Sequence, residues 1–175
     1  MILYHYSNNK FDSFEIKKEF QKTSNEGLQE GEGIYLSNDK EAFKNYGEYC
    51  YNCEVEEVYN FTTIGSIYKI ITEFLKKYDT NKIILKSFKS NNLAKDYISG
   101  IKTGNYSITN TIKNIWLCLE EEIYKMDINF DLYEYEDFLI ESWGNFLNQK
   151  VIKYYDKNFK CFVYIAKNVN LLNIK

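Results

Sequence analysis

The 175-residue chain contains no proline, and its only histidine is His5. Turns therefore have to be made by glycine and asparagine. No segment has about eighteen uninterrupted apolar residues, so we expect no helix that spans a membrane. The N-terminal residues show neither a basic stretch nor a continuous apolar run. We therefore expect no secretory signal and a cytoplasmic protein with reduced thiols.

Positive charge is not in excess either, because the formal net charge is -3. A protein that grips DNA or RNA mainly through electrostatics needs a basic surface, so nucleic acid is not an expected partner. Lysines gather between residues 76 and 89, and the acidic run Glu120–Glu122 follows later. We interpret both groups as solvated surface.

Four cysteines are present, and Cys50 and Cys53 form a Cys-x-x-Cys. The surrounding residues are typical of a strand, where positions three apart point to opposite faces. Cys118 and Cys161 have no second cysteine or histidine at ligand spacing. A zinc site needs four converging ligands, so we expect no metal site.

Hydrophobic residues make up 45% of the chain and aromatic residues 18%, which is ample for one folded domain over residues 1–175. Alternation and turn signals predict strands over residues 2–7, 33–36, 49–55, 151–155, 160–166 and 170–174. Helical periodicity and capping signals predict helices over residues 17–22, 39–46, 67–78, 93–101, 108–124 and 138–147.

This order of strands, then helices, then strands predicts the α+β class. We expect the N- and C-terminal strands to share one sheet. A helical insertion over about residues 64–130 should lie beside that sheet.

Two tyrosines at the predicted second strand and the following helix suggest a binding function. Gly33 opens the strand that carries Tyr35, and the helix returns Tyr46 eleven positions later. Two aromatic rings delivered in this way can sandwich a flat heterocycle, because offset ring stacking is favourable. His5 lies upstream in a separate strand. A lone histidine with a tyrosine pair suits a nicotinamide riboside.

The order His5-x-Ser7, Gly33-Ile-Tyr35 and Ala42-x-x-x-Tyr46 resembles the ADP-ribosyltransferase superfamily. The resemblance is to the branch with a His-Tyr-Glu triad, which includes poly(ADP-ribose) polymerases and diphtheria-type toxins. It covers residues 2–55, and more weakly 136–174. It implies a split antiparallel β-sheet core with a helical insertion, and NAD+ as the substrate.

The resemblance also implies a role for each residue. His5 would hydrogen-bond the adenosine-side ribose hydroxyl, the Tyr6 backbone would hold the nicotinamide amide, and Ser7 would add a polar contact. Tyr35 and Tyr46 would stack on the nicotinamide ring. His5, Tyr6, Ser7, Gly33, Tyr35 and Tyr46 are therefore the expected NAD+-binding residues.

The acidic residue of the triad is where this chain departs from the family. Aligning Phe162–Ile165 on the family's strand puts Lys160 at the glutamate position, where it would repel developing positive charge. Asp156 could supply the carboxylate if the hairpin folds inward, or Asn158 could be a neutral replacement. The chain could also lack the acid. Other acids, Glu134, Glu136, Asp137 and Glu141, lie on a predicted helix, with Glu141 the first to check.

The expected function is NAD-dependent mono-ADP-ribosylation of a host macromolecule, with a protein as the expected acceptor. The catalytic residues would be His5, Tyr35 and Asp156. Some phage-encoded anti-CRISPR transferases are similar, so antagonism of host immunity is one setting. A toxin of a toxin–antitoxin pair is equally consistent with the sequence. The alternative is a degenerate transferase that blocks a partner sterically.

Overall fold

The computed structural model describes residues 1–16, 30, 32–88 and 90–175. The helix predicted near residues 17–22 lies outside this part of the chain. The described residues form two compact units. Met1–Asn60 and Leu147–Lys175 make a strand unit, and Phe61–Phe146 make a helical unit. The helical segment therefore extends past residue 130, and it contains nearly all of the last helix.

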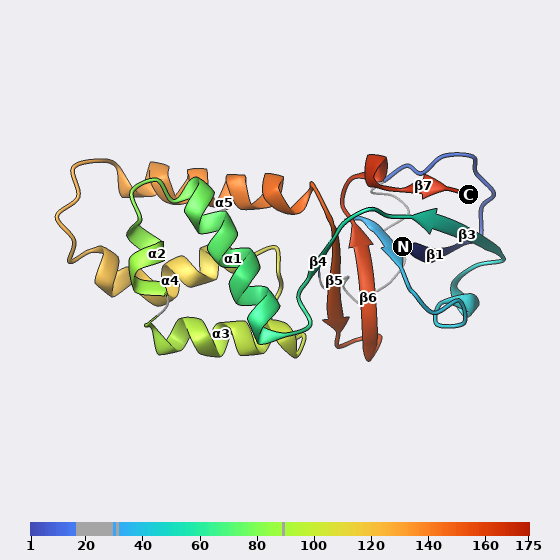
Figure 1. The fold of residues 1–175 in the computed structure, drawn as a ribbon, viewed down its shortest axis with the longest axis horizontal. Helices are drawn as coiled ribbons and strands as arrows, with labels where there is room; N and C mark the ends of the chain where they lie inside the picture. The colour runs from blue at the N-terminus through green and yellow to red at the C-terminus, as the bar shows by residue number, and fades with distance from the viewer. Residues whose placement is uncertain (17–29, 31, 89) are drawn as a thin grey trace. The chain divides into compact units, whose positions relative to one another are not determined.

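The strand unit holds two sheets, drawn as arrows in Figure 1. One sheet has the order β1 (Ile2–Ser7), β3 (Tyr49–Glu54) and β7 (Asn173–Ile174), all antiparallel. The other has the order β2 (Ile34–Leu36), β6 (Cys161–Ala166), β5 (Val151–Asp156) and β4 (Val58–Asn60).

Each sheet thus combines N-terminal and C-terminal strands. Because there are two sheets, the prediction of a single shared sheet is wrong. The second sheet is also mixed, because β4 and β5 are parallel. Parallel neighbours cannot be joined by a hairpin and need a long crossover. The helical unit follows β4 and precedes β5, so it is that crossover. The α+β class is confirmed at the level of mixed strands and helices.

An apolar cluster fills one side of the second sheet. Ile34 and Leu36 are buried there together with Leu3 of β1, Tyr164 of β6 and Leu172. Because side chains alternate along a strand, Tyr35 points to the opposite face of β2. The core thus fixes the direction of the candidate site's tyrosine.

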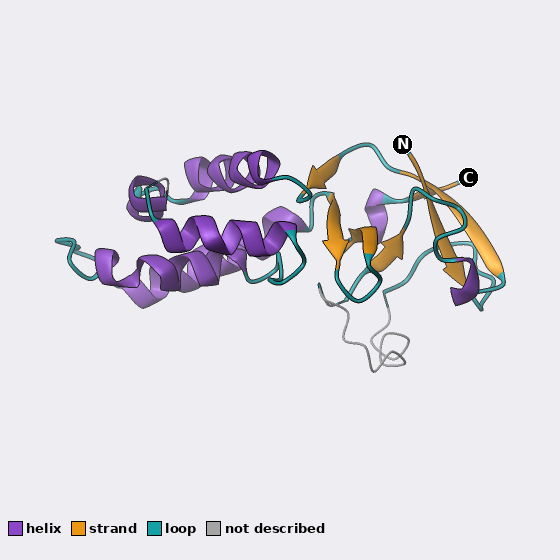
Figure 2. Cartoon of the chain, turned by 90° about the horizontal axis from the view of Figure 1, so that it is seen from below, coloured by secondary structure: helices purple, strands orange, loops and turns teal. Residues whose placement is uncertain are grey.

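Five helices make up the helical unit, shown in purple in Figure 2. They are α1 (Ile64–Tyr78), α2 (Ile83–Phe88), α3 (Asn92–Lys102), α4 (Thr111–Ile123) and α5 (Leu132–Leu147). The Thr63 and Asn91 side chains cap α1 and α3 by accepting N–H groups of the first turn. Trp143 of α5 packs edge-on against Phe74 of α1, with ring centroids 5.0 Å apart. Among the described residues, no helix combines the length and the apolar character needed to cross a membrane.

The helix predicted over residues 39–46 is wrong. Ser37 Oγ accepts the Asp39 N–H at 3.0 Å, and Asp39 Oδ1 accepts the Glu41 N–H at 2.9 Å. Such local bonds offer the backbone an alternative to a helix. Only a short 3₁₀ helix, η2 (Lys44–Tyr46), follows these turns.

Three further differences concern short elements. The strand predicted over residues 170–174 is instead a 3₁₀ helix, η3 (Val169–Leu171), followed by the two residues of β7. The Asn168 side chain caps η3 by accepting the Asn170 N–H at 3.0 Å. The sequence did not predict β4 or α2.

Asp79 explains why the short helix α2 forms. Its buried carboxylate accepts the Ile83 and Leu85 N–H groups at 3.0 and 2.8 Å. It also accepts the Tyr135 hydroxyl of α5 at 2.8 Å. One side chain therefore starts α2 and ties the Tyr78–Ile83 turn to α5.

We expect Asp79→Ala to lower the free energy of unfolding by about 3 kcal/mol, because three donors lose their acceptor inside the helical unit. Urea unfolding followed by circular dichroism measures this change. Asp96→Ala removes an exposed carboxylate from α3 and should change the same free energy by less than about 0.5 kcal/mol. Equal effects of the two substitutions would contradict the role given to Asp79.

Candidate functional site

His5 lies on β1, and its ring contacts the next sheet through a backbone atom. The Nδ1 atom is 2.8 Å from the Tyr35 carbonyl oxygen. Phe14 packs edge-on against the imidazole at 5.3 Å, and Phe11 and Tyr51 lie further along its sides. The imidazole is therefore held in one orientation.

The surroundings of His5 favour its neutral form. Burial lowers the pKa of His5, and the hydrogen bond to Tyr35 only partly opposes this. Because a carbonyl oxygen only accepts, Nδ1 carries the ring proton and donates it to Tyr35. The Nε2 atom is then a hydrogen-bond acceptor, suited to a hydroxyl group.

Tyr35, Tyr154 and Asp156 share one face of the second sheet. Tyr35 pairs with Ile165 of β6, which in turn pairs with Ile152 of β5. Tyr154 and Asp156 lie two and four residues after Ile152, so alternation puts all of them on the same face. The smaller Val163 lies opposite Tyr154 on β6.

Hydrogen bonds join these three side chains in a line. The Tyr154 hydroxyl donates to Asp156 Oδ2 at 3.0 Å. The Tyr35 hydroxyl is hydrogen-bonded to Tyr154 and contacts the Glu30 backbone. Since Tyr154 donates its only proton to the carboxylate, the Tyr35 hydroxyl donates to the Tyr154 oxygen. Burial raises the pKa of both tyrosines, so both stay protonated donors.

Asp156 is only 1% exposed, and its second carboxylate oxygen, Oδ1, organises the β5–β6 turn. Oδ1 accepts the Asn158 and Phe159 N–H groups at 2.9 and 3.1 Å. The turn ends at Lys160, whose φ of 53° lies in the left-handed region. Of the residues considered for the acid, Asp156 is the one whose carboxylate reaches the tyrosines. Lys160 lies outside β6, and Asn158 contributes a backbone donor.

Tyr46 has different surroundings from Tyr35. Its side chain is 57% exposed and packs edge-on against Phe43 and Phe159, with ring centroids 5.7 Å away in both cases. Neither contact is with Tyr35, so these contacts do not form the predicted pair of facing rings, Tyr35 and Tyr46. They do tie Tyr46 to Phe159, whose N–H is bound by Asp156.

The glycine after Tyr46 brings η2 against the end of β1. A Cβ at Gly47 would lie 2.4 Å from the backbone N and C atoms of Ser7, so only glycine fits. Gly33 is similarly close to β6, because its Cβ would lie 2.6 Å from Ile165 Cγ1. Both glycines permit close approaches that position Tyr46 and Tyr35.

Tyr6 and Ser7 complete the predicted set. The Tyr6 hydroxyl donates to the Lys40 carbonyl at 2.7 Å, and a hydrogen bond with Cys50 raises the pKa of Tyr6 to about 12. Ser7 Oγ accepts the Asn9 N–H at 3.1 Å. Both side chains make local contacts at the end of β1.

The structure thus links the Tyr35 hydroxyl to Asp156 through Tyr154, a residue that the sequence did not single out. His5 instead contacts the Tyr35 backbone carbonyl and packs against Phe14 of the apolar cluster. Tyr154 and Asp156 are spaced i and i+2 on a predicted strand, and this spacing was the available signal. Glu134, Glu136, Asp137 and Glu141 lie on α5, which belongs to the helical unit except for its last residue.

The cysteines follow the predicted strand geometry. Cys50 is exposed and Cys53 is buried, as expected for opposite faces of β3. Within the described ranges, no three His, Cys, Asp or Glu side chains are grouped so as to hold a metal ion.

Burial of His5 predicts a pH dependence of stability. The folded-state pKa lies below the unfolded value of about 6.5, so between the two the unfolded chain binds a proton that the folded chain does not. Stability should therefore fall as the pH drops below about 6.5, and His5→Gln should flatten this part of the profile. Because His5 is the only histidine, its single imidazole Hε1 NMR signal gives the folded pKa directly. A midpoint at or above 6.5 would contradict the burial argument.

The line of bonds predicts the effect of removing one hydroxyl. Tyr154→Phe should lower the free energy of unfolding by about 1–3 kcal/mol, because a buried carboxylate loses a donor and Tyr35 loses its acceptor. Tyr155→Phe is the matched control on the same strand, with an expected change below about 0.5 kcal/mol. Urea unfolding of the three proteins decides the point. Equal urea midpoints for the wild type and Tyr154→Phe would contradict a stabilising role of the Tyr154 bonds to Asp156 and Tyr35.

No family model and no curated protein sequence matches the chain. Among solved structures, it is similar to a chain described as "Crystal structure of an anti-CRISPR protein". The TM-score is 0.40 and the identity 11%, over 100% of this chain and 93% of that chain. A likeness at this level assigns neither a fold family nor an activity, so the function has to be argued from the site itself.

Proposed function

We propose that this chain is an NAD+-dependent mono-ADP-ribosyltransferase that modifies a protein of the host cell. One observation carries the proposal. His5, Tyr35 and Asp156 come from three strands far apart in the sequence, yet His5 is hydrogen-bonded to the Tyr35 backbone carbonyl, and the Tyr35 hydroxyl is linked to Asp156 through Tyr154. The sequence resemblance gives roles to His5 and Tyr35, and Asp156 is one of the residues considered for the acid that the resemblance lacks.

In the proposed reaction, the bond between ribose C1′ and the nicotinamide nitrogen breaks, and its electron pair leaves with nicotinamide. A nucleophile of the acceptor protein forms the new bond to C1′ and releases its proton. His5 binds substrate in this scheme. Its Nε2 accepts a hydrogen bond from a ribose hydroxyl, and the Tyr35 carbonyl fixes the ring for this contact.

Asp156 acts as a positioning residue rather than as a direct contact in this proposal. Its carboxylate is buried and orients the Tyr154 hydroxyl, which in turn orients Tyr35. A fixed negative charge in a poorly solvated site also favours positive charge that develops nearby on the ribose.

A second candidate is a protein of this fold that blocks a partner without turnover. The carboxylate of Asp156 already accepts three donors of its own chain, and a lysine precedes β6. This arrangement favours a structural role for the acid. Tyr46 would then serve contact with the partner, since it is exposed.

Labelling with NAD+ that carries ³²P in its adenosine half separates the two candidates. The full chain is incubated with a bacterial lysate, and nicotinamide release is measured in parallel. We expect label on protein, and at least a hundredfold loss in His5→Ala and Tyr35→Ala, since each removes a contact with the reacting substrate. Tyr155→Phe should retain full activity. Urea unfolding of each variant checks that it folds.

Each outcome decides between the candidates. Full activity of both alanine variants would show that His5 and Tyr35 do not form the NAD+ site. Absence of both label and free nicotinamide from the wild-type reaction would overturn the transferase. In that case, NAD+ binding measured by calorimetry would distinguish a degenerate transferase from a protein that has no nucleotide site.

A further inference from the structure

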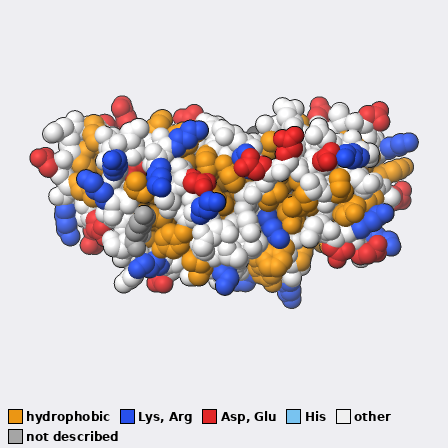
Figure 3. All heavy atoms as spheres, in the orientation of Figure 1, with side chains coloured by type: hydrophobic (Ala, Val, Ile, Leu, Met, Phe, Trp, Pro, Cys, Tyr) orange, Lys and Arg blue, Asp and Glu red, His pale blue; other side chains and the backbone are white. Residues whose placement is uncertain are grey.

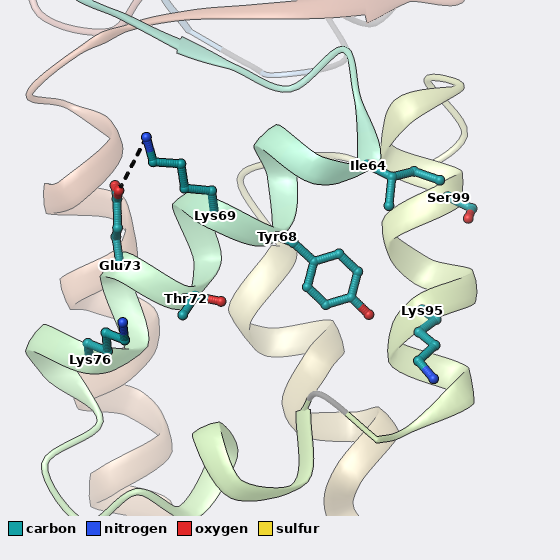
Figure 4. A pocket seen from close by; sticks show the side chains of 8 residues that line it. All are labelled: Ile64, Tyr68, Lys69, Thr72, Glu73, Lys76, Lys95 and Ser99. Carbon is teal, nitrogen blue, oxygen red and sulfur yellow. Dashed lines mark ion pairs between the residues drawn. The ribbon is translucent and has the colours of Figure 1, made fainter.

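A groove on the helical unit lies between α1 and α3 and has a volume of about 840 Å³. None of the candidate site residues lines it. Figure 4 shows Tyr68 extending from α1 toward α3, with Ile64 beside it and lysines from both helices around the rim. Ile64 is 42% exposed. The groove therefore offers an apolar floor to solvent.

The rim of the groove is basic. Lys69 is 4.0 Å from Glu73, an exposed pair of little energetic weight. Lys76 and Lys95 form no ion pair with any carboxylate in the described part of the chain, and both are exposed. Residues 61–113 hold nine lysines against three acids, and one of these acids, Asp79, is buried. Figure 3 shows lysine side chains over this part of the surface.

The second half of the same unit has the opposite charge. Residues 114–146 hold one lysine against nine acids. Glu120 of α4 lies near Glu136 and Asp137 of α5. Burial is the largest cause that raises the pKa of Glu136, and the neighbouring carboxylates of Asp137 and Glu120 raise it further. Lys113 of α4 opposes this effect in part. We call the surface formed by Glu120, Glu136 and Asp137 the acidic face.

The acidic face also carries large exposed aromatic side chains. Tyr133 is 69% exposed and Phe138 is 47% exposed. Tyr124 is hydrogen-bonded to Tyr133, and Glu120 and Glu136 lie near the Tyr124 hydroxyl. Aromatic rings surrounded by carboxylates complement an apolar floor surrounded by lysines.

We propose that the α1–α3 groove binds the acidic face of a second copy of this chain. The dimensions agree, because Ile64 to Lys76 spans about 18 Å of helix and Tyr133 to Glu141 about 12 Å, at about 1.5 Å per residue. The two surfaces differ, so the contact is heterologous and each copy offers one groove and one acidic face. The inference is independent of the proposed enzyme.

A second copy fits the groove better than a nucleic acid does. Phosphates need hydrogen-bond donors along the whole binding track, whereas the floor of this groove is formed by Ile64 and Tyr68. The exposed rings of the acidic face have an apolar counterpart there. Because the contact is small and rich in charge, it should be weak and sensitive to salt.

Charge reversal of each surface tests the proposal by sedimentation velocity of the full chain. The wild type should associate reversibly at high micromolar concentration in about 50 mM NaCl and much less in about 500 mM NaCl. Lys76→Glu/Lys95→Glu and Glu120→Lys/Asp137→Lys should each weaken association at least tenfold. An equimolar mixture of the two variants should associate again, because each reversed surface finds a reversed counterpart.

Lys40→Glu/Lys44→Glu is the matched control, since it makes the same change in net charge on exposed residues of the strand unit. It should associate as the wild type does, and circular dichroism checks that all variants are folded. A wild type that stays monomeric, or a mixture that fails to associate, would overturn the proposal. A monomeric wild type that binds duplex DNA, or a helical Glu/Leu peptide, through Lys76 and Lys95 would assign the groove to another partner.

Discussion

The buried carboxylate of Asp156 is the constraint on which the strand unit depends. Removing an ionised group from water is unfavourable unless donors surround it. Here two N–H groups of the hairpin turn and the Tyr154 hydroxyl surround it. Once those donors are in place, the register of β5 against β6 is fixed, and the Tyr154 ring has one direction. Tyr35 then takes its position from Tyr154.

Backbone contacts then connect the two sheets. Tyr4 and Ser37 exchange N–H···O bonds of 2.7 and 2.9 Å, just after the end of β2. The bond from His5 to the Tyr35 carbonyl lies beside this bridge. The His5 side chain therefore connects β1 to β2 beside this backbone bridge. The candidate site thus consists of side chains that each depend on strand pairing.

Much of this arrangement follows from local patterns in the sequence. Alternation predicted β1, β3, β5 and β6, and apolar periodicity predicted α1, α3 and α4 within a few residues. These elements have strong one-sided burial, and this is the property that periodicity detects. His5 and Tyr35 were predicted from the family resemblance, and Asp156 was predicted from its position at the β5–β6 turn.

The features that the sequence did not predict depend on side chains that bond across the fold. Helix α2 has six residues and begins where the Asp79 carboxylate, four residues upstream, accepts the Ile83 N–H. Ser37 was a possible helix cap and Asp39 an acidic residue of the predicted first turn, but their side chains bind nearby N–H groups and produce turns instead. Strand β4 forms by pairing with β5, about 90 residues further along the chain, so no local pattern predicts it. Tyr154 became significant only when β2 and β5 were known to flank the same strand.

The parallel pairing of β4 with β5 has a consequence for how the protein is made. On a ribosome, the helical unit is complete once residue 146 has emerged, and all of its contacts can form early. The second sheet has to wait, because β2 pairs with β6, which is about 130 residues further along. β2 and β4 therefore remain without their partners until the C-terminal hairpin is synthesised, whereas β1 and β3 can pair with each other earlier. The bonds that link Tyr35 to Asp156 through Tyr154 therefore form only at the last stage of translation.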